Sequence, residues 1–249
     1  MPKFFVQSNQ ISGNNIQILG DNVNHIHNVL RKKLQDTIQI CDQETGENYI
    51  AKIVEIQKDY INCQIEEKLN ETTESNVEIT LFQGVPKFDK MELIIQKNTE
   101  IGVKRIVPVM MERTIVKLNE KDKSKKVERW RKIAEIAAKQ SMRDIIPEIS
   151  DPIKTNEIFL FLDEYDVILV AYENEQKNTL KEELSKLKRK DNYKIGIIIG
   201  PEGGISEKEV QSFKETKFSL ISLGKRILRT ETAGLVMASN IIYELEEGV

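Results

Sequence analysis

Apolar residues recur at nearly every second position in several stretches of the first seventy residues, which is the period of a half-buried strand. In residues 60–66, three apolar side chains share one face and polar side chains share the other. Residues 37–41 and 47–56 follow similar patterns, and residues 23–30 carry a short helical one. Several short strands at this spacing predict a small β-barrel.

From residue 77 onward, stretches with the pattern of a strand alternate with stretches that have the period of a helix. In order, they are a strand at 77–84, a helix at 91–102, a strand at 105–110, a helix at 127–141, a strand at 166–172 and a helix at 179–190. This alternation predicts an α/β domain with a parallel sheet and helices on both faces. The polar stretch between the two regions has no period, so we predict domains at 1–72 and 73–249.

A buried strand followed by a glycine loop is the most informative local pattern. Residues 195–199 are four isoleucines and one glycine, which is typical of a strand buried on both faces. Pro201 must end that strand, and the two glycines at 203–204 permit positive φ and the close approach of a ligand. Ser206 and Glu209 have the spacing of a capping box, so a helix follows. Ligands of open α/β sheets bind at such places, beyond the carboxyl ends of the strands.

A second loop of this kind follows a predicted strand at 218–223. Residues 224–234 leave that strand and enter the last helix, which Thr230 or Thr232 could cap. One glycine-containing loop alone is typical of any tight connection between a strand and a helix. Two such loops together favour a binding site over a purely structural interpretation.

Charge argues against a general nucleic-acid binder, because the chain of 249 residues has a net charge of −3 and a pI of about 5.7. The first 76 residues contain 7 basic and 11 acidic residues, a net charge of −4. Any contact with RNA must therefore come from local basic patches.

Several common functional classes lack their sequence signatures here. The chain has no phosphate-binding loop of the Gly-x-x-x-x-Gly-Lys type, no Gly-x-Gly-x-x-Gly after the first strand of the α/β region and no Gly-x-Ser-x-Gly elbow. Its two cysteines and two histidines lack zinc-ligand spacing, so we expect no metal. It has no apolar stretch of membrane-spanning length, and residues 3–6 already resemble a strand. We therefore expect a cytoplasmic protein without a membrane segment.

The two C-terminal loops resemble those of a known family. Residues 200–204 and 223–233 are similar to the RsmE family of 16S rRNA uridine-N3 methyltransferases, which belongs to the SPOUT superfamily. Residues 90–117 and 140–143 resemble the same family, as does His25 with the segment Val29-Leu30-Arg31. The resemblance covers nearly the whole chain. Departures occur at Gln35, where glycine is usual, and at residues 41–43, which lack the usual Asp-Gly turn.

The resemblance implies a PUA-like N-terminal barrel that binds the RNA substrate and a C-terminal SPOUT α/β domain with a parallel sheet and a deep trefoil knot. It also implies a homodimer, S-adenosyl-L-methionine as the methyl donor and 16S rRNA in the small ribosomal subunit as the partner. The implied donor-binding residues are Ile199, Gly200, Pro201, Glu202, Gly203, Gly204, Leu223, Gly224, Ile227, Leu228 and Ala233. Backbone groups of such loops can bind an adenine edge, while the isoleucines and leucines form apolar walls.

The implied chemistry assigns two candidate catalytic residues. Uracil N3 is a poor nucleophile until its proton leaves, and the negative charge then spreads over O2 and O4. Arg229 is the candidate for stabilising that charge, and Glu231 is the candidate for orienting Arg229 or accepting the proton. The expected RNA contacts are Arg31, Lys97, Arg113 and Arg143.

Two other functions fit the same sequence. A different SPOUT enzyme would methylate a ribose 2′-hydroxyl, and an RNA-binding assembly factor would retain the loops without catalysis. Identification of the methylated nucleoside distinguishes the ribose methyltransferase from the uridine-N3 methyltransferase. Measurement of donor binding distinguishes the assembly factor from both enzymes.

Overall fold

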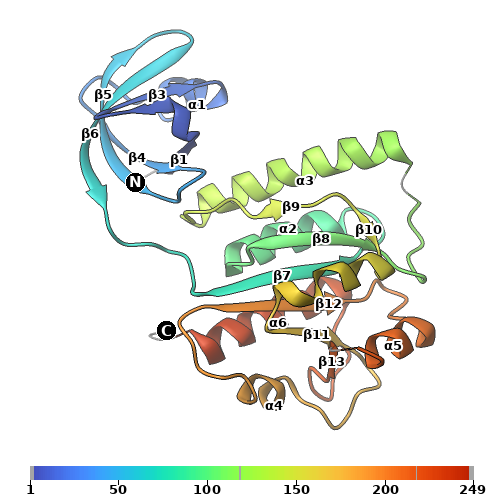
Figure 1. Cartoon of the computed structure of the whole chain (residues 1–249). Coiled ribbons are helices and arrows are strands. Elements are labelled where there is room, and N and C mark those ends of the chain that lie inside the picture. The colour runs from blue at the N-terminus through green and yellow to red at the C-terminus, as the bar shows by residue number, and fades with distance from the viewer. Residues whose placement is uncertain (1–2, 118, 217, 247–249) are drawn as a thin grey trace. The chain divides into compact units, whose positions relative to one another are not determined.

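A computed structural model of the chain describes residues 3–117, 119–216 and 218–246. The chain forms two compact units (Figure 1). The N-terminal unit contains Met1–Glu74 together with Ala138–Ile146, and the C-terminal unit contains Ser75–Ala137 together with Pro147–Val249. Among the helices of the described ranges, none combines the length and the hydropathy needed to cross a membrane.

The N-terminal unit is built on a six-stranded sheet with the order β1-β4-β5-β6-β3-β2. Its strands are β1 (Lys3–Val6), β2 (Ile11–Ser12), β3 (Asn15–Leu19), β4 (Thr37–Asp42), β5 (Asn48–Ile56) and β6 (Tyr60–Leu69). Strand β1 pairs with β4 in parallel, and the other pairs are antiparallel. The alternation predicted for residues 60–66 is confirmed, because Ile61 and Cys63 are fully buried. Short helical turns complete the unit at η1 (Ser8–Gln10), α1 (Asp21–Asn24) and η2 (His25–Val29).

Gln35 adopts the backbone conformation that a glycine would adopt most easily. Its φ is +73°, in the left-handed region that side chains with a Cβ rarely occupy. Its N–H donates to Ile53 O at 2.8 Å. The turn before β4 therefore keeps a left-handed residue although the usual glycine is absent.

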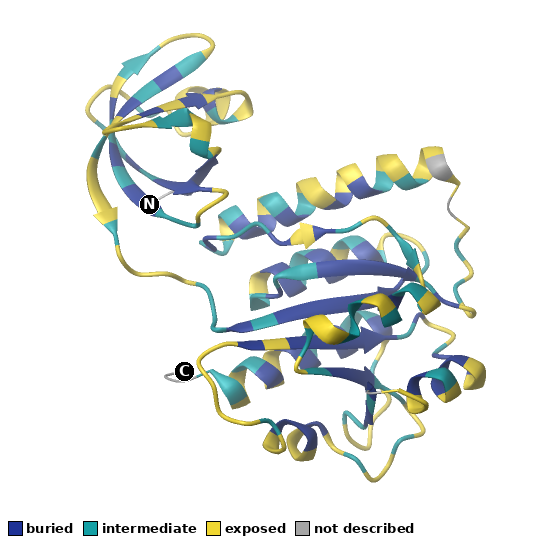
Figure 2. Cartoon of the chain, in the orientation of Figure 1, coloured by how far each residue is buried: buried dark blue, intermediate teal, exposed yellow. Residues whose placement is uncertain are grey.

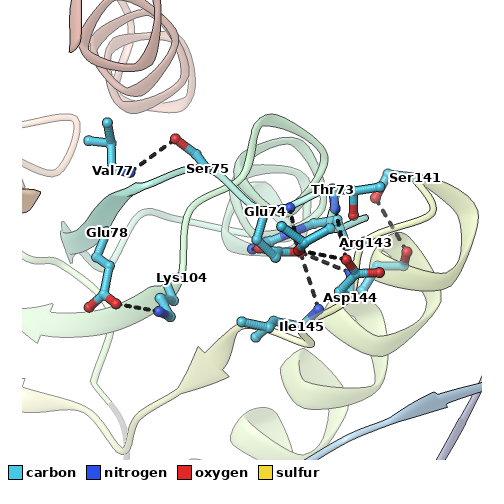
Figure 3. A network of polar contacts seen from close by, with 12 residues as sticks. Thr73, Glu74, Ser75, Val77, Glu78, Lys104, Ser141, Arg143, Asp144 and Ile145 are labelled. Carbon is cyan, nitrogen blue, oxygen red and sulfur yellow. Dashed lines mark hydrogen bonds and ion pairs between the residues drawn. The ribbon is translucent and has the colours of Figure 1, made fainter. Parts of the chain in front are cut away.

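A segment from the middle of the chain, residues 138–146, belongs to the N-terminal unit. The carboxylate of Asp144 accepts hydrogen bonds from Lys3 Nζ, Thr72 Oγ1 and Thr73 N. The Lys3 and Asp144 side chains form an ion pair and are only 1 % and 2 % exposed. Arg143 beside it is paired with Glu74, whose carboxylate also accepts the N–H of Asp144 at 2.9 Å (Figure 3). These buried polar contacts fix the segment to the first and last parts of the unit.

The C-terminal unit contains a seven-stranded sheet in which every described pair is parallel. The order is β10-β8-β7-β12-β11-β13, and β9 pairs with β8. The strands are β7 (Val77–Gly84), β8 (Arg105–Met110), β9 (Glu148–Ile149), β10 (Ile153–Lys154), β11 (Val167–Ala171), β12 (Tyr193–Ile199) and β13 (Phe218–Ile221). The predicted α/β class with a parallel sheet is confirmed. The knot implied by the resemblance stays a prediction.

The helices of the α/β region connect these strands. They are α2 (Lys90–Ile101), α3 (Glu120–Gln140), η3 (Thr155–Glu164), α4 (Leu180–Ser185), α5 (Glu207–Lys214) and α6 (Thr230–Leu245). The sequence pattern did not predict η3 or the two-residue strands β9 and β10. The two strands contain too few residues to show a period, and η3 is a 3-10 helix, whose three residues per turn differ from the period of an α-helix.

Strand β12 lies between β7 and β11 and is buried except at Lys194, near its start (Figure 2). Ile195, Ile197 and Ile198 are fully buried, as the charge-free sequence predicts. Gly196 is required by packing, since a Cβ there would lie 3.0 Å from Ile168 Cγ1. Helix α6 packs against β7 and β12, with Gly234 facing the side chains of Leu81 and Ile199. The carboxyl end of β12, from which the glycine loop begins, is therefore packed against the neighbouring strands and α6.

Candidate active site

A cavity of about 520 Å³ lies at the carboxyl ends of β11, β12 and β13. Its walls are residues 199–205 after β12, residues 222–229 after β13 and the first turn of α6, with Lys90 and residues 171–173 completing them. The two loops predicted as a binding site are thus brought together around one cavity. Volumes of this size are typical of small-molecule sites.

The loop after β12 leaves no space for side chains at its glycines. A Cβ on Gly200 would lie 3.0 Å from the carbonyl carbon of Gly204. Gly204 itself has φ +71°, and a Cβ there would lie 2.8 Å from Glu173 Oε1. The Gly204 N–H donates to Pro201 O at 2.9 Å and closes the turn. The positive φ predicted for this loop is present at Gly204, and the close approach of a ligand stays a prediction.

Helix α5 begins with the predicted capping box. Ser206 Oγ accepts from Glu209 N, and Glu209 Oε2 accepts from Ser206 N at 3.1 Å. Glu209 also accepts hydrogen bonds from Glu112 N at 3.0 Å and from Thr155 Oγ1 at 2.7 Å. Burial alone would raise the pKa of Glu209, but these hydrogen bonds outweigh burial and lower the pKa below its ordinary value. The charged carboxylate of Glu209 thus fixes the start of α5, directly after the glycine loop.

The loop after β13 is open in comparison. Gly224 has φ +106°, and a Cβ on it would meet nothing within 4 Å, while Ile227 is 85 % exposed. Leu223 and Leu228 are partly buried, and Ala233 is 7 % exposed on the first turn of α6. All of the predicted donor-binding residues line the cavity. Ile227, however, is too exposed to enclose a ligand in this arrangement.

Helix α6 is not capped by a threonine side chain as we expected. Arg229 occupies the N-cap position, and no side chain caps the helix there. The Thr230 hydroxyl instead donates to Gly200 O at 2.7 Å and accepts from Gln83 Nε2 at 2.9 Å. The Thr230 hydroxyl therefore bonds to Gly200, just after β12, instead of to a backbone N–H of its own helix.

A charged group that the sequence did not reveal lies at the rim of the cavity. Lys90 Nζ is 3.0 Å from Glu202 Oε1 and 3.5 Å from Glu231 Oε2. The hydrogen bond to Glu202 is the main cause of the raised pKa of Lys90. Burial would raise the pKa of Glu202, but hydrogen bonds from backbone N–H groups and Lys90 lower it. Lys90 begins α2, and only the fold places it beside loops more than a hundred residues away.

The two candidate catalytic residues occupy different environments. The Glu231 side chain is 15 % exposed, whereas that of Arg229 is 83 % exposed. Arg229 Nη1 lies 4.0 Å from Glu231 Oε1, the outer limit of an ion pair. Within the part of the chain that the structure describes, Glu231 Oε2 is buried and accepts no hydrogen bond. Arg229 is thus an exposed cation at the cavity, and Glu231 is a buried anion at its edge.

The four expected RNA contacts are divided between the two units. Arg113 is exposed and donates to Gly203 O at 3.0 Å, directly beside the glycine loop. Arg31 is exposed in the N-terminal unit, and Lys97 pairs with Glu100 on α2. Arg143 departs from the expectation, because its side chain is only 5 % exposed and is paired with Glu74. In this arrangement the Arg143 guanidinium stabilises the N-terminal unit rather than presenting a charge to RNA.

The fold and the cavity are those of an RNA methyltransferase. Residues 73–242 match the family model described as an RNA methyltransferase domain, and residues 18–66 match the one described as an RNA methyltransferase PUA domain. The predicted PUA-like N-terminal region and the predicted methyltransferase domain are therefore confirmed in kind.

The particular family follows from named relatives. Ribosomal RNA small subunit methyltransferase E of Bacillus subtilis is 37 % identical over 233 residues, covering 92 % of this chain and 90 % of the relative. The protein of that name from Buchnera aphidicola (subsp. Acyrthosiphon pisum) is 35 % identical, with coverage of 95 % and 90 %. The chain belongs to the ribosomal RNA small subunit methyltransferase E family, and the resemblance inferred from its motifs is confirmed.

Solved structures agree with this assignment. Ribosomal RNA small subunit methyltransferase E of Neisseria gonorrhoeae, bound to S-adenosyl methionine, superposes with a TM-score of 0.85 at 30 % identity, over all of both chains. A methyltransferase of Legionella pneumophila in complex with the same cofactor has a TM-score of 0.84 at 26 % identity, over 98 % of each chain.

Proposed function

We propose that this protein transfers a methyl group from S-adenosyl-L-methionine to N3 of a uridine in the 16S rRNA of the small ribosomal subunit. The observation that carries the proposal is the cavity enclosed by the two glycine loops in a chain of this family. Relatives named ribosomal RNA small subunit methyltransferase E act, by that name, on ribosomal RNA of the small subunit. The Neisseria gonorrhoeae protein of that name binds the donor.

The cavity suits the donor in size and in chemistry. Its volume of about 520 Å³ is within the usual range for small-molecule sites. The tight backbone at Gly200 and Gly204 presents peptide groups that can bind a nucleobase edge, and Ile199 and Leu228 supply apolar contact. When bound there, S-adenosyl-L-methionine would supply an electrophilic methyl carbon.

Arg229 is assigned to the substrate. Loss of the N3 proton to solvent would leave negative charge on O2 and O4 of uracil. N3 would then form the new bond to the methyl carbon as the bond from that carbon to the donor sulfur breaks, with S-adenosyl-L-homocysteine as the leaving group. A guanidinium stays charged at any pH of interest and can donate to both the base and its surroundings. The 83 % exposure of Arg229 leaves its donors available for an incoming base. A cation aimed at a developing anion is the usual means of stabilising such a transition state.

Glu231 is assigned to orientation. It is held by Lys90 at 3.5 Å on one side and lies 4.0 Å from Arg229 on the other. A carboxylate is a weak base at neutral pH, so a role in directing Arg229 suits it better than removal of the proton.

The proposed substrate is the assembled small subunit rather than naked RNA. The first 76 residues have a net charge of −4, which gives little general attraction for phosphate. Recognition must then depend on shape and on local cations such as Arg31 and Arg113.

The proposed assembly is a homodimer with knotted donor-binding loops, in the cytoplasm. On α6, Met237 and Ile241 are fully buried, while Val236 and Ile242 stay partly exposed and Tyr243 is 74 % exposed. This leaves apolar surface for a second copy. Sedimentation at micromolar concentration should give twice the 28.7 kDa mass of the chain, and a persistent monomer would refute the dimer.

Two measurements test the function. Titration calorimetry should show binding of S-adenosyl-L-methionine, and donor labelled in its methyl group should label small subunits faster than protein-free 16S rRNA at equal salt. Donor binding without transfer to either RNA would favour the non-catalytic assembly factor. Faster labelling of protein-free RNA would refute the preference for the subunit.

A further inference from the structure

Phe88 combines an unusual backbone conformation with an exposed ring. It lies in the connection between β7 and α2, has φ +55° and is 85 % exposed. A bulky residue in the left-handed region is strained, and such strain persists where the surrounding structure imposes it. Burial of the ring does not offset the strain, because the ring faces solvent. Phe88 therefore lowers the stability of the folded chain, and a function in binding would account for a phenylalanine at this position.

Residues on both sides of Phe88 contact a carboxylate in the wall of the cavity, one through its backbone and one through its side chain. The Lys87 N–H donates to the two carboxylate oxygens of Glu202 at 3.1 and 3.2 Å. Lys90 Nζ lies 3.0 Å from the same carboxylate. Glu202 and Lys90 both line the cavity. The connection that carries Phe88 is thus attached, through Lys87 and Lys90, to one carboxylate of the cavity wall.

Several cations lie on the loops around the cavity that this connection adjoins. Lys87, Arg113 and Arg226 lie on or beside the cavity loops, and none of them forms a salt bridge with a described carboxylate. Of the three carboxylates of described residues that line the cavity, Glu202 and Glu231 are paired with Lys90, and Glu173 is exposed. Local positive charge is therefore available at the rim although the chain has a net charge of −3.

We propose that Phe88 is a stacking platform for a base of the RNA strand that enters the cavity, an inference that rests on the proposed function. An exposed aromatic side chain, on a connection attached to a cavity that is lined by cations, matches the aromatic and basic composition of surfaces that bind single-stranded nucleic acid. A protein interface is a poorer match, because the cores of such interfaces are depleted in lysine and Phe88 is flanked by Lys87 and Asp89. Phe88 is a positioning residue for the substrate, and Arg229 remains the group that acts on the reacting base.

Phe88→Gly removes the aromatic ring without straining the backbone, so it tests base stacking without destabilising the fold. Glycine adopts positive φ without strain, so the melting temperature should stay the same or rise. The concentration of small subunits that gives half-maximal single-turnover rate should increase roughly 5- to 150-fold, the range for loss of one stacked base. Affinity for S-adenosyl-L-methionine should be unchanged. Leu160→Ala is the matched control, since Leu160 is 80 % exposed in η3 and does not line the cavity.

Phe88→Trp gives a direct spectroscopic test. The chain has one tryptophan, Trp130, which is 3 % exposed, so a tryptophan at position 88 would supply the exposed signal. Addition of small subunits without donor should quench that fluorescence, and half-saturation of turnover should remain close to that of the original protein. Phe88→Leu, which keeps apolar bulk without an aromatic face, should behave like Phe88→Gly.

Three outcomes would overturn the proposal. They are unchanged half-saturation in Phe88→Gly, full activity in Phe88→Leu, and dissociation of a dimer by Phe88→Gly, which would place the ring at a contact between two copies. A failure of methyl transfer by the unaltered protein would instead refute the proposed function. The quenching experiment contains no donor and reports on base stacking in either case.

Discussion

The hydroxyl of Thr230 donates a hydrogen bond of 2.7 Å to the backbone carbonyl of Gly200. Thr230 is the first residue of α6, and Gly200 is the first residue after β12. The same hydroxyl accepts a hydrogen bond from Gln83 near the end of β7. One buried hydroxyl therefore connects the two loops of the cavity to each other and to a central strand.

Thr230→Val should weaken this connection without changing the volume of the side chain. Two buried polar groups would lose a partner, and each such loss costs about 1–3 kcal/mol. We expect a lower free energy of unfolding and weaker binding of S-adenosyl-L-methionine, measured by denaturant titration and calorimetry. Thr230→Ser keeps the hydroxyl and is the control. Equal donor affinity in the valine and serine variants would show that the connection does not shape the cavity.

Gly204→Ala should impair donor binding by straining a loop that lines the cavity. Its φ of +71° disfavours any Cβ, at about 1–3 kcal/mol, whereas the nearest atom to the new methyl group, Glu173 Oε1 at 2.8 Å, ends an exposed side chain that can move away. Gly46→Ala provides a control for strain alone, because Gly46 has φ +73° and an open surrounding. Calorimetry should show weaker donor binding only in Gly204→Ala. Equal donor affinity in two folded variants would contradict the role of Gly204.

Local pattern was sufficient to predict the loops of this site. The isoleucine run of β12, its end at Pro201 and the capping box at Ser206 depend on neighbouring residues, so sequence alone predicts them. Thr230 shows the limit of that reasoning. Its helix-capping role was expected from local chemistry, but its partner Gly200 is thirty residues away and comes within reach only in the folded sheet.

The segment 138–146 shows the same limit at the level of a whole unit. Its assignment to the N-terminal unit depends on Asp144 meeting Lys3, a pairing across 141 residues. No periodic pattern encodes such a pair. The same applies to Arg143, whose position in a polar helix end suggested an exposed cation, whereas Glu74 holds it in a buried ion pair.

Asp144→Asn should destabilise the N-terminal unit at neutral pH. Removal of one partner from a buried ion pair typically costs about 3–5 kcal/mol, since Lys3 would keep an uncompensated charge. Glu78→Gln is the control, because its pair with Lys104 is about 40 % exposed and such pairs contribute at most about 1 kcal/mol (Figure 3). Denaturant titration of the three proteins at pH 7 provides the comparison.

The difference between the original protein and Asp144→Asn should depend on pH. Burial would raise the pKa of Asp144, but hydrogen bonds from Lys3, Thr73 and Thr72 lower it below 3.8. A depressed carboxyl pKa stabilises the folded state fully above the ordinary value, and this contribution disappears as the pH falls through the lower, folded value. The difference in stability between the two proteins should therefore begin to shrink below about pH 4 and disappear only below the lower, folded pKa. A constant difference from pH 7 down to pH 2 would contradict this assignment.

Arg229→Ala should reduce the rate of methyl transfer with little effect on donor affinity. Loss of one group that stabilises a developing anion typically lowers the rate about 10²- to 10³-fold. Single-turnover measurement with saturating small subunits reports that step, and calorimetry reports donor binding. The neighbouring exposed cation Arg226 provides the matched control, Arg226→Ala, for loss of charge at the cavity. Near-normal single-turnover rates in Arg229→Ala would exclude Arg229 from the chemistry.

The product of the reaction tests the central claim most directly. Small subunits lacking the modification are incubated with the protein and with S-adenosyl-L-methionine labelled in its methyl group, and the 16S rRNA is then digested to nucleosides and separated. We predict that the label is recovered in 3-methyluridine. Label on a ribose 2′-oxygen, or on any base other than uracil, would contradict the proposed reaction.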